Sequence, residues 1–516
     1  MTKVFVPNQS RFQTLLWQCN KLKSMIFKRI NVKSQLYNLL NTKMKRKVCL
    51  SYFLLLIFSS FQAWADSNLV KIGDSLIDPQ ALTIKGSFGQ AINGKSFQQD
   101  AVISHKDYQY AAYYDSKRRV CLAKRKLPAG KWDILRFTDY DFKSNDGHNT
   151  ISMGICPKDG TIHLAFDHHG HPLHYRVSKK QAASMPEKTS WNEELFGPVI
   201  SELEKGKPIR ITYPRFLQTP DGNLQFFYRR GGSGNGDRML VDYDPQNGTW
   251  LNTRQIDSGK GTYEGSTSRC SYPNGYTYGP KGKLHATWVW REGGGTANHD
   301  LAYMYSEDNG TTWLNNKGVK LKEPPGVDSP GINTVKIHQT YGLMNTHGQA
   351  IDSQGRIHVV MWHCSDESLK AAGSKPGESR WGPAQARRYN HYWRDKNAQW
   401  HHQELPWKSG GRPKLFIDTK NNAYLIYSAE NEFANATVKS ANLNIARATA
   451  ASKWIDWKII HVEKGPFVNE MLGDPYRWKD QQILSIMLQE SPKKKHEPTK
   501  LRIIDFKLVE TCLDDG

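Results

Sequence analysis

The chain has 516 residues, of which 38% are apolar and 11% aromatic, and its 71 Lys and Arg against 49 Asp and Glu give a net charge of +22. With this aromatic content, 41 glycines and 24 prolines exclude a helical bundle or a disordered chain and favour many short strands joined by turns. A polytopic membrane protein is also excluded, because only the stretch 48–65 is apolar enough to consider as a span.

The first predicted element is a secretory signal at 44–65. Three basic residues at 45–47 precede an apolar run, and the segment ends in Ala63-Trp64-Ala65, a small-x-small cleavage pattern. We expect cleavage near Ala65, secretion to an extracellular or periplasmic location, and no membrane span in the mature chain; a membrane anchor is the alternative. Because such signals begin a precursor, we interpret Met44 as the true start and residues 1–43 as a misassigned upstream extension.

The mature chain, 66–516, remains basic. Residues 1–65 hold 11 Lys and Arg and no acidic residue, so the net charge falls from +22 to +11. This positive excess suits a polyanionic partner, and export favours an acidic polysaccharide over nucleic acid. Five cysteines remain, an odd number without paired spacing, which leaves open one disulfide, free buried thiols or a metal ligand. They are Cys121, Cys156, Cys270, Cys364 and Cys512.

Short β-rich segments recur along the mature chain at intervals of roughly 60 residues. Alternation such as IHLAF at 162–166 is typical of a strand, and the Asp-Gly or Lys-Gly pairs before several segments predict hairpin turns. Seven such units predict an all-β chain forming one seven-bladed β-propeller domain over 66–516, with a two-sheet sandwich as the alternative. The segments begin near Lys106, Asp159, Asp221, Lys281, Ser353, Thr419 and Trp478.

Two further patterns fit a propeller. The run Ser306-x-Asp308-x-Gly310-x-Thr312-Trp313 matches the Asp-box turn of sialidase-like propellers, which marks a hairpin between strands and carries no chemistry. The last strand is predicted at 501–508. We expect it to pair with an N-terminal strand near 81–86, because such pairing closes the ring and removes free edges.

Residues with catalytic chemistry cluster in the second to fourth units. Imidazole, phenol and guanidinium groups from neighbouring blades can converge over one face of a propeller, where the inner-strand loops gather. The candidate runs are Asp146-Gly147-His148-Asn149, Asp167-His168-His169-Gly170-His171, Tyr213-Pro214-Arg215, Tyr228-Arg229-Arg230 and Arg269-Cys270-Ser271-Tyr272.

From Asp146 to Trp313 the chain resembles the propeller ulvan lyases, most closely the short-chain polysaccharide lyase family 25. The resemblance extends over the mature chain and is weakest at both ends. It implies a secreted seven-bladed propeller that cuts ulvan, a sulfated rhamnose–uronate polymer of green algae, into unsaturated uronyl oligosaccharides. The order and spacing of four residues match that family's active site: His148, His168, Tyr213 and Arg229. Tyr272 fits with about one residue of slack, and His169 is the alternative to His168.

The implied reaction is β-elimination at a uronate. A cation must first neutralise the carboxylate charge, and the guanidinium of Arg229 can do so through a bidentate contact. His148 is suited to take the C5 proton because imidazole titrates near neutral pH, and Tyr213 can protonate the departing O4, or act as base for the other C5 epimer. His168 would share the proton transfer or orient the sugar. The predicted substrate contacts are Tyr272, His169, Asn149, Arg230 and Arg215.

Two other functions remain open at this stage. A sialidase-like glycoside hydrolase needs paired carboxyl groups, for which Asp146 and Asp167 are the candidates. A non-catalytic propeller could bind sulfated glycan through Arg215, Arg229, Arg230 and Arg291. In both cases, as for the lyase, the expected partner is a glycan and the expected state is a monomer.

A structural zinc ion is implied by the resemblance, since the related lyases hold one with histidines and a cysteine. The predicted ligands are His299, His347, His363 and Cys364, with His338 as a further candidate. His363 and Cys364 are strand neighbours that point to opposite faces, so both can bind one ion only where the strand ends. Such an ion would tie loops together, because β-elimination needs no metal-bound hydroxide. No organic cofactor is expected.

Overall fold

The computed structural model describes residues 67–84, 92–94, 101–232, 234–293, 296–345, 348–430 and 441–510. The predicted signal at 44–65, the upstream extension 1–43, Cys512 and His347 lie outside the described residues. The prediction of an all-β chain is confirmed, because nearly all regular structure there is strand. None of the described helices is long and apolar enough to cross a membrane.

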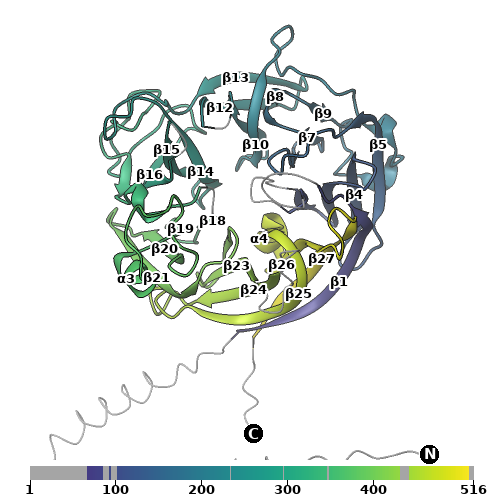
Figure 1. Ribbon diagram of the computed structural model, residues 1–516. Coiled ribbons are helices and arrows are strands. Elements are labelled where there is room, and N and C mark those ends of the chain that lie inside the picture. The colour runs from purple at the N-terminus through teal and green to yellow at the C-terminus, as the bar shows by residue number, and fades with distance from the viewer. Residues whose placement is uncertain are drawn as a thin grey trace, which may run out of the picture. The chain divides into compact units, whose positions relative to one another are not determined.

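Asn68–Val509 forms one compact unit in which sheets follow one another around a ring in chain order (Figure 1). The first sheet contains β2 (Val102–His105), β3 (Tyr108–Tyr114), β4 (Arg119–Lys126) and β5 (Asp133–Asp141). The second sheet contains β6 (Ile151–Ile155), β7 (Ile162–Phe166) and β9 (Tyr175–Val177). The third sheet contains β8 (His169–Pro172), β10 (Arg210–Gln218), β11 (Leu224–Arg230), β12 (Asp237–Asp244) and β13 (Thr249–Gln255).

Two four-stranded sheets and a larger one continue the ring. The two contain β14 (Arg269–Tyr278), β15 (Leu284–Glu292), β16 (Asn298–Ser306) and β17 (Asn333–Val335), and β18 (Gly348–Ile351), β19 (Ile357–His363), β20 (Arg388–Arg394) and β21 (Trp400–Lys408). The larger sheet has the order β1-β27-β26-β25-β24-β23-β22. Its strands are β22 (Lys414–Ile417), β23 (Ala423–Glu430), β24 (Ala441–Ala448), β25 (Lys458–Gly473), β26 (Ile483–Glu490), β27 (Thr499–Glu510) and β1 (Ser67–Ala81).

Short helices occur only in connections within the part of the chain described. They are α3 (Asp366–Ala371), α4 (Pro475–Gln481) and the 3-10 turns η2 (Pro186–Lys188), η3 (Glu193–Leu195) and η4 (Gln339–Tyr341). The segment predicted to begin near Trp478 is therefore a strand only from Ile483, since Trp478 itself lies in α4. Asp474 accepts hydrogen bonds from the backbone N–H groups of Tyr476 and Arg477 and so caps this helix.

The hydrogen-bonded sheets do not correspond one-to-one with the seven predicted units. The largest sheet joins two units because the 16-residue strand β25 pairs with β24 through its first half and with β26 through its second half. All seven predicted segments nevertheless contain a strand that lies between two antiparallel partners. These strands are β3, β7, β11, β15, β19, β23 and β26.

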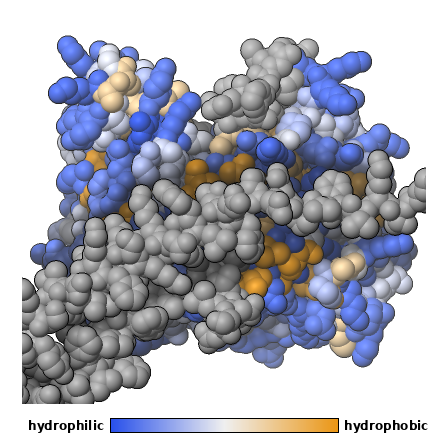
Figure 2. Space-filling view, turned by 90° about the horizontal axis from the view of Figure 1, so that it is seen from below, coloured by the Kyte–Doolittle hydropathy of each residue, from blue (hydrophilic) through white to orange (hydrophobic). Residues whose placement is uncertain are grey.

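The last strand pairs with an N-terminal strand, as predicted, but the partner differs. It is β1 (Ser67–Ala81), which ends where the predicted partner at 81–86 begins. Buried charges support this junction: Arg125 of β4 forms an ion pair with Asp505 of β27 at 2.8 Å, and Arg477 contacts the same carboxylate at 2.8 Å. On the outer strand β1, Val70, Ile72 and Leu76 are exposed. In Figure 2, hydrophilic residues dominate both margins of the visible surface and apolar residues gather between them.

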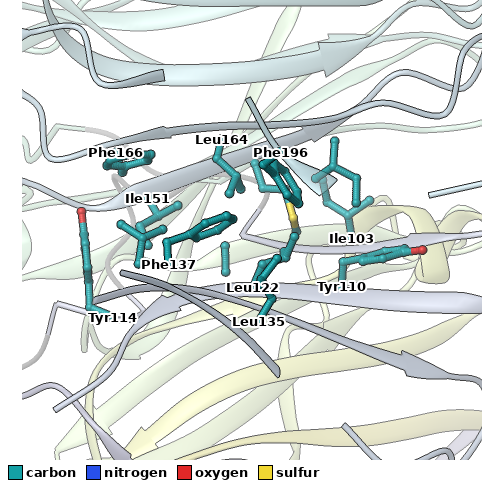
Figure 3. Packing of buried hydrophobic residues seen from close by; sticks show 14 of the residues in the cluster. Ile103, Tyr110, Tyr114, Leu122, Leu135, Phe137, Ile151, Leu164, Phe166 and Phe196 are labelled. Carbon is teal, nitrogen blue, oxygen red and sulfur yellow. The ribbon is translucent and has the colours of Figure 1, made fainter. Parts of the chain in front are cut away.

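Cores form where successive sheets face each other. Tyr110, Leu122 and Phe137 from the first sheet and Ile151 and Phe166 from the second belong to one hydrophobic cluster (Figure 3), and all five are buried. Alternate residues of each strand point to the same face of its sheet. Each sheet therefore packs one set of side chains against the sheet before it and the other set against the sheet after it. This packing leaves the strand ends and their loops to carry polar groups.

The predicted Asp-box is a tight hairpin after β16. The Asp308 carboxylate accepts a hydrogen bond from the Thr312 N–H at 2.8 Å, and the Ser306 hydroxyl oxygen accepts one from the Gly310 N–H at 2.7 Å. Gly310 has φ +82°, a left-handed conformation that favours glycine. Trp313 then enters the core between the third and fourth sheets. The motif is therefore structural, as expected.

Candidate active site

One carboxylate, Asp146, holds two histidine rings. It lies in the loop between β5 and β6, and its Oδ1 accepts a hydrogen bond from Nδ1–H of His148 at 2.5 Å, while its Oδ2 accepts one from Nδ1–H of His169 at 2.6 Å. The two imidazoles are stacked, with centroids 4.2 Å apart. A carboxylate can only accept, so the neutral form of either ring carries its proton on Nδ1 and keeps a lone pair on Nε2.

His169 reaches this cluster through an unexpected strand pairing. It begins β8, which joins the following sheet, and there it pairs with Thr212 of β10. On its other side Thr212 pairs with Arg229 of β11. The residue after Thr212 is Tyr213, so the histidine and the arginine flank the backbone that carries the tyrosine.

Tyr213 sits at a distortion of β10. Its φ is +54°, the register of β10 on β11 shifts between Thr212 and Arg215, and Pro214 next to it has no N–H to give to the sheet. A positive φ in a bulky residue is strained and is found mainly at functional sites. The bulge brings the phenol ring to 6.3 Å from the His148 ring and 6.0 Å from the His169 ring.

Arg229 lies against two tyrosine rings. Its guanidinium carbon is 5.1 Å from the Tyr213 centroid and 4.4 Å from the Tyr272 centroid. Nη2 donates to the Ser271 carbonyl, Nη1 lies 3.5 Å from the Gly232 carbonyl, and Nε has no partner among the described residues. The side chain is only 2% exposed, so its charge is buried beside neutral acceptors.

Tyr272 joins Arg229 to a second arginine. Its hydroxyl oxygen accepts hydrogen bonds from Nη1 of Arg291 and from the Gly234 N–H, both at 3.2 Å. The Arg291 guanidinium carbon is 4.4 Å from the Tyr272 centroid, the same separation as that of Arg229. Two cations therefore contact one ring, at the end of the sheets where β14 starts and β15 finishes.

Burial and the shared carboxylate set the protonation of the cluster. Burial lowers the pKa of His148, and the hydrogen bond to Asp146 opposes this shift only in part. Although burial alone would raise it, the pKa of Asp146 lies far below its usual range because His148 and His169 donate to it. Burial opposes the charge of Arg229, but the neighbouring Cys270, Tyr272 and Tyr213 favour it and raise its pKa overall. Near neutral pH the site therefore holds a neutral His148, a carboxylate and a guanidinium.

The structure does not bring His168 into this cluster. Its Nε2 accepts a hydrogen bond from the His174 N–H at 2.8 Å, its ring stacks near that of His174 at 5.5 Å, and it is 1% exposed. Burial lowers the pKa of His168 well below its usual value. The preceding residue, Asp167, has φ +61°, and this turn sends His168 and His169 in different directions. Of the two adjacent histidines, His169 is the one beside His148 and Tyr213.

Three predicted substrate-contact residues have structural partners. Asn149 is fully buried and donates to the Asp167 carboxylate. Arg215 is 7% exposed and donates to the Pro273 carbonyl at 3.1 Å, which links two sheets. Arg230 points outward and pairs with Asp237 at 3.2 Å. Strand alternation explains why Arg229 faces the site and Arg230 does not.

Each predicted zinc ligand that the structure describes has another partner in it, and the ligand set stays a prediction because His347 lies outside the described residues. His299 contacts Glu292 at 2.9 Å and stacks on Tyr263. His363 donates from Nδ1 to the Cys364 carbonyl and accepts at Nε2 from Tyr392. Cys364 packs with Leu369 and Ala386, and the further candidate His338 pairs with Glu264 at 2.9 Å. The strand β19 ends at His363, so strand alternation does not fix the direction of Cys364. Four cysteines are free and buried: Cys121, Cys156, Cys270 and Cys364.

Within the described residues, one group could hold a metal ion. The donor atoms of Asp146, His148 and His169 all lie within 4.8 Å of one another. A carboxylate and two imidazoles are a donor set that zinc accepts. An ion would have to displace both Nδ1–H protons, and the hydrogen bonds to Asp146 account for the arrangement without one.

Sequence reasoning misses the central role of Asp146 and the place of Arg291. From the sequence, Asp146 is a candidate only as one of a pair of hydrolytic carboxyls, although its position two residues before His148 suggests a local hydrogen bond. Arg291 is a candidate only as a surface contact for a binding protein. Its neighbours Asn298 and Asn345, which hold its guanidinium, come from other strands and loops.

Comparison with known proteins places the chain in a family. The sequence profile of the BNR repeat-containing family matches residues 108–407, more than half of the chain. The chain belongs to this family. The match includes the Asp-box hairpin and all residues of the histidine–tyrosine–arginine cluster.

Curated relatives of this BNR repeat-containing protein include ulvan lyases. The long isoform of ulvan lyase from Pseudoalteromonas sp. (strain PLSV) is 26% identical over 313 residues, which cover 51% of this chain and 31% of that protein. The short isoform from Alteromonas sp. (strain LOR) is 26% identical over 205 residues, covering 32% of this chain and 38% of that protein. The chain thus spans about a third of the length of the curated relatives it matches.

Solved structures share the fold of the BNR repeat-containing chain. The crystal structure of polysaccharide lyase Uly1 has a TM-score of 0.67 at 17% identity and covers 85% of this chain and 100% of its own. A PL25 ulvan lyase bound to -[GlcA(1-4)Rha3S]- has a TM-score of 0.59 at 14% identity, covering 86% and 96%. At these identities the likeness concerns the arrangement of the strands.

Proposed function

We propose that this protein is a polysaccharide lyase that cleaves ulvan by β-elimination at the uronate and releases unsaturated uronyl oligosaccharides. The observation that carries the proposal is the pair of histidines held by Asp146 beside Tyr213, with Arg229 against the tyrosine ring. Ulvan lyases among the relatives, and the glucuronate–sulfated rhamnose ligand named for one structural neighbour, support the choice of substrate.

In the proposed reaction His148 Nε2 takes the proton from C5 of the uronate. The C–H electron pair forms the C4=C5 double bond, the C4–O4 bond breaks, and Tyr213 gives its proton to O4. Asp146 stabilises the imidazolium that forms, as a buried carboxylate does for a catalytic histidine. The guanidinium of Arg229 stabilises negative charge on the substrate carboxylate and on the Tyr213 oxygen, an effect that is large at a site with little water.

The other site residues have supporting roles in this proposal. His169 takes the place predicted for His168: its Nε2 is buried without a partner in the described part of the chain, and its lone pair can accept a hydrogen bond from a sugar hydroxyl. Tyr272 orients Arg229. A zinc ion held by Asp146, His148 and His169 would add positive charge beside the substrate, but the proton transfers above need only the side chains.

Hydrolysis is less well supported. The cluster contains one carboxylate, Asp146, whose two oxygens are already held by His148 and His169. Asp167 is bound by Tyr140 and Asn149. A glycosidase needs one carboxyl group to protonate the leaving oxygen and another to act on the opposite face of the sugar, and neither of these is available.

The proposal includes the architecture and location of the protein. We infer seven blades in one domain over 66–516, because seven strands lie between two antiparallel partners and β25 is shared by the last two units. We also infer secretion, on the strength of the predicted signal at 44–65 with cleavage near Ala65. The protein would act as a monomer on a polyanion outside the cytoplasm.

Incubation of the purified protein with ulvan tests the function. A rise in ultraviolet absorbance from unsaturated uronate together with new reducing ends means a lyase; reducing ends alone mean a hydrolase, and binding without either means a glycan-binding protein. We expect Tyr213→Phe and Arg229→Ala each to lose about 100-fold or more of the activity. Tyr108→Phe, which removes a phenol hydroxyl from the first sheet, is the matched control. Full activity in both site variants would refute the site.

A further inference from the structure

A row of alternating cations and aromatic rings leads away from the candidate active site. Starting at Arg229 and Tyr272, it continues with Arg291, whose guanidinium carbon lies 5.4 Å from the Trp381 centroid. Arg380 follows on the same ring at 4.5 Å. Arg291 is the last residue but one of β15, whereas Arg380 and Trp381 belong to the connection between β19 and β20. The row thus crosses from the fourth unit to the fifth.

These arginines have only neutral partners among the described residues. Arg291 donates to the Asn298 and Asn345 side-chain oxygens and to the Tyr272 hydroxyl, and Arg380 donates to the Thr296 carbonyl at 3.1 Å. By contrast, Arg269 on the same sheet as Arg291 is held by Glu292 at 2.7 Å. Neutral oxygens and aromatic faces orient a guanidinium without cancelling its charge.

Arg291 and Arg380 contact the same tryptophan ring, which keeps their charges near each other. Both lie over the Trp381 ring, so their guanidinium carbons are no more than about 10 Å apart, roughly one Debye length at 0.1 M salt. Burial and the charge of Arg291 together lower the pKa of Arg380. An anion placed between them would relieve the repulsion and accept hydrogen bonds from two forks.

The loop that carries Trp381 is fixed in place. Arg387 donates to the Trp381 carbonyl at 3.1 Å and to the Gly382 carbonyl at 3.0 Å. Gly342 has φ +67°, and a Cβ there would lie 2.4 Å from the Trp381 carbonyl carbon. A Cβ on Gly382 would lie 2.3 Å from the Cys364 sulfur. Cys364, predicted as a zinc ligand, therefore packs under this loop, and the site is built before any ligand arrives.

We propose that Arg291, Trp381 and Arg380 form a second anion subsite that binds a sulfate ester of a sugar next to the uronate in the active site. This inference rests on the proposed lyase function. A sulfate ester has three terminal oxygens, which can accept hydrogen bonds from two guanidinium groups on different segments. A planar carboxylate, by contrast, pairs best with a single guanidinium group. Trp381 also offers an aromatic face at a half-buried position, on which a sugar ring can pack.

Binding in an inactive background separates this subsite from catalysis. In Tyr213→Phe protein, we expect Arg380→Gln combined with Trp381→Leu to weaken calorimetric binding of native ulvan oligosaccharides about tenfold and to leave chemically desulfated oligosaccharides unaffected. Arg380 is exposed, so Arg380→Gln alone tests the charge without disturbing packing. Arg502→Gln, which removes an equal charge paired with Asp74 and Glu490 on the last strand, is the control and should bind like the parent.

Activity measurements complete the test. With Tyr213 intact, Arg380→Gln should raise KM for native ulvan and leave kcat within about twofold, because the subsite does not touch the reacting atoms. Equal losses on native and desulfated ligand, or no loss on either, would overturn the subsite. If the chain fails to cleave ulvan but still binds sulfated ligand through Arg380 and Trp381, the subsite stands and the lyase function falls. If the chain cleaves ulvan but its binding does not depend on sulfate, the lyase function stands and the subsite falls.

Discussion

Replacement of Asp146 by Asn tests the arrangement on which the proposed chemistry depends. Both carboxylate oxygens accept a hydrogen bond from an Nδ1–H, at 2.5 and 2.6 Å. An amide keeps the shape but offers one oxygen and one NH2, so one of the two histidines would face a donor. That ring must then move its proton to Nε2 or lose the contact, and in either case Nε2 is no longer held ready as a base.

The size of the effect follows from what the carboxylate supplies. It fixes the tautomer of His148 and stabilises the imidazolium, and loss of such a carboxylate typically lowers kcat about 1,000- to 10,000-fold. Asp146 also raises the pKa of His148 against the effect of burial. Without it that pKa falls further, so the base stays neutral to lower pH. The acid limb of the kcat/KM profile should therefore move to lower pH while the maximum drops.

The assay is the initial rate of unsaturated uronate formation from ulvan across a pH series. Circular dichroism and the thermal midpoint report whether the variant is folded. Asp221→Asn makes the same chemical change at an exposed turn, where the carboxylate pairs with Lys158, and should retain parental rates. Asp146→Asn protein that is folded, keeps more than half the activity and shows an unmoved acid limb would refute the proposed role of the two histidines.

The remaining predictions concern stability. Arg125→Met leaves the buried Asp505 with Arg477 as its one remaining cation among the described residues, and should lower the free energy of unfolding by about 3 kcal/mol in a urea titration; an unchanged midpoint would show that this ion pair does not hold β27 to the first sheet. His163 is fully buried between Thr161 and Tyr175, and burial lowers its pKa to about 3. The fold favours the neutral form of His163, so the stability that depends on this form is fully present above pH 6.5 and is lost as pH falls toward 3, by roughly 5 kcal/mol in total. His163→Gln should flatten the dependence of unfolding free energy on pH over that range, and an unaltered slope would contradict the assignment.

Local sequence patterns predicted the strands well because each strand carries its own signal. The alternation at 162–166 became β7 with the predicted bounds, and Gly160, Gly222 and Gly282 have positive φ at the turns where Asp-Gly and Lys-Gly pairs indicated hairpins. The Asp-box was recognised for the same reason, since the hydrogen bonds that Ser306 and Asp308 make to form the turn lie within seven residues. The partner of the last strand was misplaced because pairing between chain ends depends on register, which no local pattern records.

Residue types and their order were enough to select His148, Tyr213, Arg229 and Tyr272, and the structure places these four side by side. The sequence favoured His168 and kept His169 as the alternative, whereas the structure places His169 beside His148, because a single left-handed residue, Asp167, decides which ring faces the site. The sequence singled out Arg229 as the active-site cation, but it gave no sign that Arg229 and Arg291 share one tyrosine ring, since that arrangement requires two sheets to pack together. The zinc ligand set stays a prediction, because the spacing of these residues says nothing of the partners, such as Glu292 and Tyr392, that contact His299 and His363.

By itself the sequence determined the class of fold, the basic charge and the chemical groups available to the site, because composition and period-two alternation act within one strand or turn. Only the tertiary structure decided that Asp146 serves both histidines, that Tyr213 is turned inward by a bulge, and that Trp381 holds two arginines. Those contacts join strands and loops far apart in the chain, and their geometry is set by how neighbouring sheets pack around the ring.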